Sequence, residues 1–138
     1  MKSKFLLFAF LGIVVFYTAC TSKDSVLEET TLNGTWKLKN VSGGLADINI
    51  DYNEGDVYWT FNTKNGKLEV INNIETTGPE DIYAIFDTGT YNFTVSTEAT
   101  EDVLYVSGEK IGVITISKDK LLLDQGVPVD GVLTEFVR

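Results

Sequence analysis

From residue 32 onward, the chain is built of short segments in which every second residue is apolar. In the stretch VYWTFN at 57–62, the large apolar residues Val57, Trp59 and Phe61 recur at every second position. This period of two is typical of a strand with one buried face. Many short strands of this kind predict an all-β barrel or sandwich. Eight are expected, roughly ten residues apart, at 35–39, 57–62, 67–70, 90–96, 103–106, 111–116, 121–124 and 132–138.

Turn signals between these strands favour a simple up-and-down order. Asn65-Gly66 suits a tight hairpin because both residues tolerate positive φ angles. Short links between consecutive strands favour a meander over a Greek key. Pro79 followed by two acidic residues is a helix-start signal, so one short helix or lid is expected near 79–86. The strands at 103–106 and 111–116 are apolar on both faces, and this helix or a partner subunit is the expected cover.

The first twenty residues are typical of an export signal that ends in a cysteine. Lys2 and Lys4 precede an uncharged apolar stretch, 5–17, which is shorter than the about 20 residues that span a bilayer and fits a signal peptide. Ala19 and Cys20 follow, and because Cys20 is the only cysteine, no internal disulfide can form. This arrangement resembles the lipobox of bacterial lipoproteins. The resemblance implies a lipidated Cys20 as the mature N-terminus, anchored in the bacterial outer membrane on its periplasmic or surface-exposed face.

The expected organisation is a lipoprotein signal peptide at 1–19, a lipidated N-terminus and tether at 20–31, and a β domain at 32–138. The tether is polar and charged. Within it, Lys23 and Asp24 resemble the surface-export signal of Bacteroidetes lipoproteins, and Asp24-Ser25-Val26 resembles the O-glycosylation motif of that phylum. An ordinary solvated linker is the simpler interpretation of both motifs, and glycosylation of Ser25 stays open.

The net charge argues against two ways of binding other molecules. Removal of 1–19 takes away two lysines and no acidic residue, so the mature chain has 9 basic and 20 acidic residues and a formal charge of −11. Nucleic acids and anionic lipid surfaces both attract basic proteins. Nucleic acid is therefore not an expected partner. The membrane is expected to be reached only through the lipid on Cys20.

Several kinds of catalytic and metal site are also disfavoured. The chain has no histidine, which removes the commonest general base, the Ser–His and Cys–His pairs, and histidine metal sites. The acidic stretch DINIDYNEGD at 47–56 matches the first positions of an EF-hand loop. However, Tyr52 replaces the turn glycine of that loop and Tyr58 its bidentate glutamate. We expect a solvated loop at the barrel mouth there, no cofactor, no metal and no enzymatic activity.

Three stretches carry a resemblance to a known family. LNGTWKL at 32–38, followed by VSGG at 41–44, is similar to the opening of lipocalin-like proteins, with the glycine-x-tryptophan motif at Gly34 and Trp36. VYWTF at 57–61 and LLLDQGVPVDGVLTEFVR at 121–138 resemble later strands of small, Bacteroidetes-type lipocalin-like domains. The resemblance implies an eight-stranded antiparallel up-and-down β-barrel. It also implies that the tryptophan packs inside one end, with an arginine of the last strand across it.

Arg138 is the only arginine in the chain and its last residue. By strand alternation it shares a face with Phe136 and Thr134. A guanidinium group over an indole gives a cation–π contact of about 0.5–2 kcal/mol. The alternative is that Arg138 frays into solvent, as chain ends often do. Closure of one barrel end by Gly34, Trp36 and Arg138 is the favoured interpretation.

The inward-facing apolar residues are candidates for the lining of a ligand cavity. Small eight-stranded barrels either fill their interior with side chains or hold one small ligand. We expect binding of a small apolar or amphipathic ligand, and the alternative is a protein-interaction or inhibitor module with a solid core. In a cavity, Tyr91 and Tyr105 would supply hydroxyl contacts and Trp59 a stacking wall. The candidate lining comprises Val57, Trp59, Phe61, Leu68, Val70, Tyr91, Phe93, Val95 and Tyr105.

Lipidation can be tested by growing a bacterium that expresses the protein with labelled palmitate. The wild-type chain is expected to incorporate the label, and Cys20→Ala is expected to lose it because no other cysteine can be acylated. The matched variant Ser22→Ala keeps the cysteine and should be labelled like the wild type. An unlabelled wild-type protein would refute the anchor.

Overall fold

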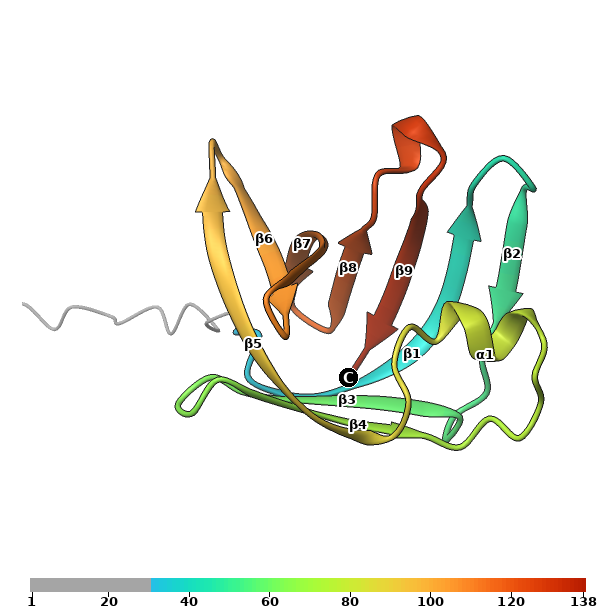
Figure 1. The fold of residues 1–138 in the computed structure, drawn as a ribbon, viewed down its shortest axis with the longest axis horizontal. Helices are drawn as coiled ribbons and strands as arrows, with labels where there is room; N and C mark the ends of the chain where they lie inside the picture. The colour runs from blue at the N-terminus through green and yellow to red at the C-terminus, as the bar shows by residue number, and fades with distance from the viewer. Residues whose placement is uncertain (1–30) are drawn as a thin grey trace, which may run out of the picture.

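The computed structural model describes residues 31–138, and the signal peptide, Cys20 and the tether up to residue 30 lie outside this part. One antiparallel sheet of nine strands accounts for most of it, with one short α-helix, α1 (Pro79–Tyr83), and one 3-10 turn, η1 (Val127–Val129) (Figure 1). Neither helical element between residues 31 and 138 is long and apolar enough to cross a membrane. The strands are β1 (Gly34–Gly43), β2 (Ile48–Asp51), β3 (Val57–Asn62), β4 (Lys67–Asn72), β5 (Gly89–Glu98), β6 (Glu101–Val106), β7 (Glu109–Ser117), β8 (Lys120–Asp124) and β9 (Val132–Val137).

Eight of these strands close into a barrel. Strands β1 and β3 to β9 are antiparallel neighbours in this order, and β9 pairs with β1 to complete the ring. The register places Trp36 opposite Trp59 and Leu38 opposite Phe136. These eight strands are the ones that alternation predicts, so the all-β, eight-stranded up-and-down barrel is confirmed.

The ninth strand, β2, lies where a solvated loop was expected. It pairs with the second half of β1, beyond the residues of β1 that pair with β3. Asn40 Nδ2 donates hydrogen bonds of 2.9 Å to the side-chain oxygens of Asn49 and Asp51. These acidic-stretch residues are therefore cross-strand partners in a sheet. Within residues 31–138, no group of three or more His, Cys, Asp and Glu side chains could hold a metal ion.

The middle of the barrel is filled by its own side chains. Trp36, Trp59 and Phe136 are completely buried, and Phe61 almost so. The Trp59 ring centroid lies 4.7 Å from that of Phe136 and 6.0 Å from that of Phe61. Full burial of a large apolar side chain contributes about 1.5–3 kcal/mol. All members of the buried cluster in the described part of the chain lie between Leu32 and Phe136.

The barrel has two ends, which we name after their covering residues. The Leu32 end contains the start of β1, the hairpins β3–β4 and β5–β6, the turn β7–β8 and the C-terminus. The α1 end contains the remaining connections. There, the Tyr52 hydroxyl donates to the Glu80 carbonyl at 2.8 Å, and burial, with nearby acidic groups, raises the pKa of Tyr52 to about 12. Phe86 follows the helix and lies 5.3 Å from Trp59, centroid to centroid.

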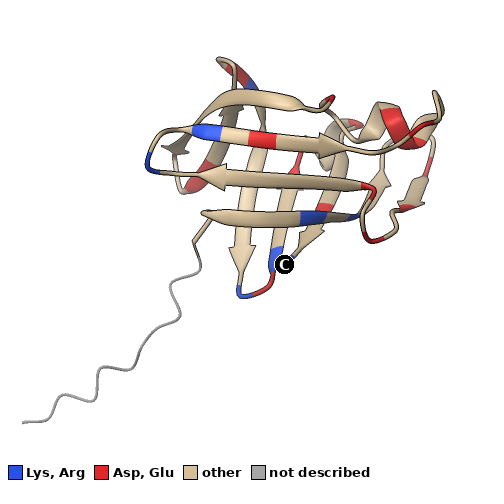
Figure 2. Cartoon of the chain, turned by 90° about the horizontal axis from the view of Figure 1, so that it is seen from below, with Lys and Arg blue, Asp and Glu red and all other residues tan. Residues whose placement is uncertain are grey.

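Helix α1 begins at Pro79 with Glu80 and Asp81 in its first turn, which confirms the predicted short helix. It lies at one end of the barrel (Figures 1 and 2), where its Tyr83 lines a hollow with Gly44 and Ile48. It is therefore not the cover expected over the two strands that are apolar on both faces, β6 and β7. A β-bulge accounts for part of this two-sided apolar pattern. Ile111 of β7 is the extra residue opposite the pair Leu104 and Tyr105 of β6, and it packs against the core.

The hydroxyl of Thr134 offers a test of core packing. Thr134 is completely buried, opposite Val41 and Leu123, and its hydroxyl has no hydrogen-bond partner among the described residues. A buried polar group without a partner costs about 1–3 kcal/mol. Thr134→Val keeps the side-chain shape and is expected to raise the free energy of unfolding by about 1 kcal/mol in urea denaturation.

Thr35→Val is the matched control. The Thr35 hydroxyl lies 2.9 Å from that of Thr60, so this substitution breaks an existing hydrogen bond and should not stabilise the protein. A Thr134→Val protein that is less stable than the wild type would show that the hydroxyl is bonded in solution, contrary to the expectation.

Candidate functional site

Most of the predicted lining residues belong to the solid centre of the barrel. They share nearly complete burial and membership of one apolar cluster. Their side chains face one another instead of an open space. These residues therefore fill the barrel interior and do not line a cavity. These residues are Val57, Trp59, Phe61, Leu68 and Val70.

The two predicted hydroxyl contacts lie in different places. Tyr91 faces inward at the α1 end, where its hydroxyl donates to the Asp87 carbonyl at 2.9 Å. Tyr105 lies on the outer face of the barrel, opposite Thr94, and its hydroxyl donates to the Glu98 carboxylate. This hydrogen bond raises the pKa of Tyr105 and lowers that of Glu98. The expectation that Tyr105 lines a cavity is therefore wrong, because alternation along β6 turns Leu104 and Val106 inward instead.

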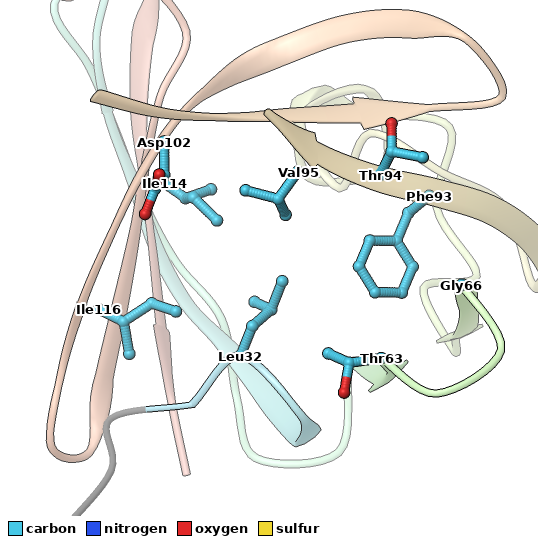
Figure 3. Close-up of a pocket in the computed structure, with 9 residues that line it drawn as sticks. All are labelled: Leu32, Thr63, Gly66, Phe93, Thr94, Val95, Asp102, Ile114 and Ile116. Atoms are coloured by element: carbon cyan, nitrogen blue, oxygen red, sulfur yellow. The ribbon is translucent and has the colours of Figure 1, made fainter. Parts of the chain in front are cut away.

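A hollow is found at the Leu32 end. Strand β4 pairs with β5 only from Gly89 to Asn92, and the Phe93 N–H then bonds to the Gly66 carbonyl at 2.9 Å. Beyond this point, β5 runs on to Glu98 without β4 beside it. The divergence leaves a pocket of about 580 Å³ (Figure 3). Its lining residues are Leu32, Thr63, Gly66, Phe93, Thr94, Val95, Asp102, Ile114 and Ile116.

The walls of this pocket are mainly apolar. Figure 3 shows Leu32 directed into the space between Val95, Ile116 and Phe93. Val95 is 40% exposed although it stands opposite the inward-facing Leu104 of β6. Its exposure arises because it faces the pocket rather than a packed neighbour. Of the nine predicted lining residues, Phe93 and Val95 are the two that line this pocket.

Three residues of the lining carry polar groups: Thr63, Thr94 and Asp102. Alternation along β5 places the Thr94 side chain on the outer face, and Figure 3 shows its hydroxyl directed away from Leu32 and Val95. Asp102 stands opposite Thr97 and Ile114, and its Oδ1 accepts a hydrogen bond of 2.8 Å from the Thr97 hydroxyl. Asp102 is the one charged residue of the lining. The pocket thus combines apolar walls with one carboxylate at its edge.

The predicted closure residues hold the segment that forms one wall of the pocket. The Trp36 indole N–H donates to the Leu32 carbonyl at 2.9 Å. The Arg138 guanidinium carbon lies 4.1 Å from the Trp36 ring centroid, and its Nη2 donates to the carbonyls of Thr31 and Asn33. Arg138 is itself fixed through its main-chain N–H, which bonds to the Asp119 carbonyl at 3.0 Å. Arg138 therefore has the backbone and side-chain contacts that the closure interpretation expects.

Gly34 is the third predicted closure residue. Its φ angle is +116°, a backbone conformation that side chains with a Cβ rarely adopt. This bend lets the segment that carries Leu32 turn across the barrel end before β1 begins. The three residues act on the backbone at 31–34, and Leu32 supplies the side chain that contacts the pocket.

Sequence reasoning missed most of the pocket residues. Ile114 and Ile116 follow the inward alternation of β7 and could have been found from it. Leu32 precedes the first strand, where no periodic signal exists. Asp102 is an acidic residue near a hairpin, which is usually a sign of an outward-facing position. The pocket arises from the early end of the β4–β5 pairing, which has no local sequence signal.

The contact between Arg138 and Trp36 is testable by a double-mutant cycle. Arg138→Lys keeps the charge but stacks less well, so it is expected to lower the unfolding free energy by about 1 kcal/mol. The cycle with Trp36→Phe should give a coupling energy of about 0.5 kcal/mol or more in urea denaturation. Trp36 fluorescence, read in a Trp59→Phe background, should also change. Additive effects and an unchanged spectrum would contradict the contact.

Comparisons with protein-family models, with curated proteins and with solved structures gave no significant match to this chain. A function must therefore be assigned from the barrel, its pocket and the residues that build them.

Proposed function

We propose that this protein is a lipid-anchored lipoprotein of the bacterial outer membrane, whose lipocalin-like barrel binds a small apolar or amphipathic ligand without catalysis. The single observation that supports ligand binding is the apolar pocket at the Leu32 end. Its volume of about 580 Å³ falls within the range of known small-molecule sites, about 300–1,000 Å³. The solid centre of the barrel places this site at the barrel end and not in the middle.

The position of the pocket agrees with an anchor at Cys20. Leu32, which lines the pocket, is the residue by which the tether enters the barrel. Twelve positions separate it from Cys20, and an extended chain of this length spans at most about 43 Å. In the proposed arrangement, the pocket therefore stays within this distance of the bilayer. Such proximity favours an amphiphile that partitions between the membrane and the protein.

The absence of catalysis is part of the proposal for a chemical reason. Catalytic acids and bases have pKa values tuned by burial or by neighbouring charges. Among residues 31–138, the groups with shifted pKa values are Lys37, Tyr52, Glu54, Glu98 and Tyr105, and none of them lines the pocket. Asp102, the pocket carboxylate, faces no second acid or base within the lining.

A protein-interaction module is the second candidate, and strand β2 favours it. This strand is the last of the sheet order, so in the described part of the chain one of its edges has no strand partner. A free edge can accept an extended peptide as an additional strand. With only four residues, however, β2 offers a short docking site.

The neutral fluorophore N-phenyl-1-naphthylamine can decide between these functions. The protein for this experiment is the chain from residue 20 with Cys20→Ala, which keeps every described member of the buried cluster. We expect this protein to bind the fluorophore with enhanced emission, and to yield co-purified small molecules on organic extraction. Val95→Trp should weaken fluorophore binding at least about tenfold, because the indole would occupy the pocket.

Ile71→Trp is the matched control. Ile71 is 41% exposed, as Val95 is, but it stands opposite Tyr58 on the outer face of the barrel. This variant should bind the fluorophore like the parent protein, and circular dichroism should show that both variants are folded. A parent protein that binds no fluorophore and yields a clean extract would refute ligand binding and leave the interaction module.

A further inference from the structure

We infer that the pocket at the Leu32 end selects amphiphiles with a cationic head, such as a primary ammonium group, over amphiphiles with a carboxylate head. This inference rests on the proposed function and names the ligand class of the same site. It follows from the charge of the lining and from where the carboxylate lies.

Asp102 gives the pocket its charge. Seven of its eight fellow lining residues are apolar or carry a neutral hydroxyl, the eighth is a glycine, and none is a lysine or arginine. Asp102 belongs to the face of β6 that turns toward the barrel interior, because it pairs with Ile114 of the same lining. Figure 3 shows it beside Ile114, at the edge of the space that Val95 and Leu32 enter. Asp102 is exposed near the rim, so its carboxylate is accessible to a ligand.

The Asp102 carboxylate has capacity for a ligand. Its Oδ1 accepts a hydrogen bond from Thr97, the residue opposite it on β5. An ionised carboxylate has about four acceptor positions on its two oxygens. The bond to Thr97 fixes the orientation of the group and uses one of them. An ammonium head has three N–H donors and no acceptor, so it matches this site in both charge and hydrogen-bonding sense.

Three of the basic residues at this end of the barrel have other contacts, and Lys64 and Lys118, in the turns at 63–66 and 118–119, lie outside the lining. Lys67 Nζ donates to the Asn92 side chain at 2.6 Å, and Lys120 pairs with Glu135 at 2.9 Å. Arg138 bonds to the carbonyls of Thr31 and Asn33 and stacks on Trp36. None of these three cations lines the pocket. Because the lining itself holds no cation, a ligand carboxylate in the pocket would meet only the like charge of Asp102.

The arrangement of the lining also orients an amphiphile. Asp102 lies close to the β5–β6 hairpin, at the rim of the barrel end. Val95, Ile114 and Ile116 supply the apolar wall next to it. A ligand can thus place its head at the rim, in contact with water, and its alkyl chain against this wall. The ion pair would remain partly solvated, and pairs of this kind contribute up to about a fivefold change in affinity.

The experiment compares three probes with the same alkyl chain, dodecylammonium, dodecanol and dodecanoate, each below its aggregation concentration. Each probe displaces N-phenyl-1-naphthylamine from the chain from residue 20 with Cys20→Ala. We expect the order ammonium, alcohol, carboxylate, with an ammonium affinity about three- to fivefold above that of the alcohol at low salt. Added salt should reduce this preference, because the pair is exposed to solvent.

Asp102→Asn tests the named residue. The variant should weaken dodecylammonium binding about three- to fivefold and leave dodecanol binding unchanged. Glu101→Gln is the matched control, since it removes the same charge from the adjacent residue, which alternation places on the opposite face. It should keep the ammonium preference, so that the local effect of Asp102 is separated from the overall negative charge of the chain.

Two sets of results would contradict the inference or the proposed function. Equal affinities for the three heads, a preference for dodecanoate, or the same loss in both variants would overturn the inference while leaving ligand binding intact. Failure of all three probes and of the fluorophore to bind would overturn the proposed function itself.

Discussion

The pairing of the first barrel strand with the last is the constraint on which the rest of the structure depends. Strand β9 pairs with β1 from Lys37 to Gly43, and this contact joins segments about a hundred positions apart. It removes two free sheet edges and brings the inner faces of Trp36, Leu38 and Phe136 together. It also places Arg138 beside the segment that precedes β1. Without this pairing, neither the core nor the wall supplied by Leu32 would have a fixed position.

Closure of the sheet does not by itself create a binding site. The interior of this barrel is occupied by its own aromatic and aliphatic residues, with Trp59 in contact with rings on three sides: Phe61, Phe86 and Phe136. The pocket at the Leu32 end arises where the strands separate. Strand β5 is longer than its pairing with β4, and its free portion bends away with β6 and β7. The pocket is thus a consequence of unequal strand lengths in a closed ring.

Local patterns in the sequence were sufficient for the strands and the helix, because alternation and helix-start signals are short-range properties. The eight barrel strands and the start of α1 at Pro79 follow from them. The position of Arg138 over Trp36 also agrees with alternation on two distant strands.

Strand β2 could not be predicted because acidic residues flank Ile48 and Ile50, so its alternation resembles a polar loop. Tyr105 was assigned to the wrong face because β6 is apolar at consecutive positions, which hides the phase of the alternation. The pocket could not be predicted, since it depends on where one strand pairing ends.

The pocket leaves apolar space inside the barrel end unfilled, and this needs an explanation. Apolar space that side chains could fill costs stability, and cores are normally packed to high density. In this barrel the centre follows that rule, while Val95 remains 40% exposed beside a hollow at one end. A longer side chain at that position would bury more apolar surface. Departures from close packing of this kind are expected at functional sites, where the structure is adapted to a second molecule. The exposed carboxylate of Asp102 lies in the same pocket. Unfilled apolar space and a charged group therefore occur together at the end of the barrel that contains Leu32.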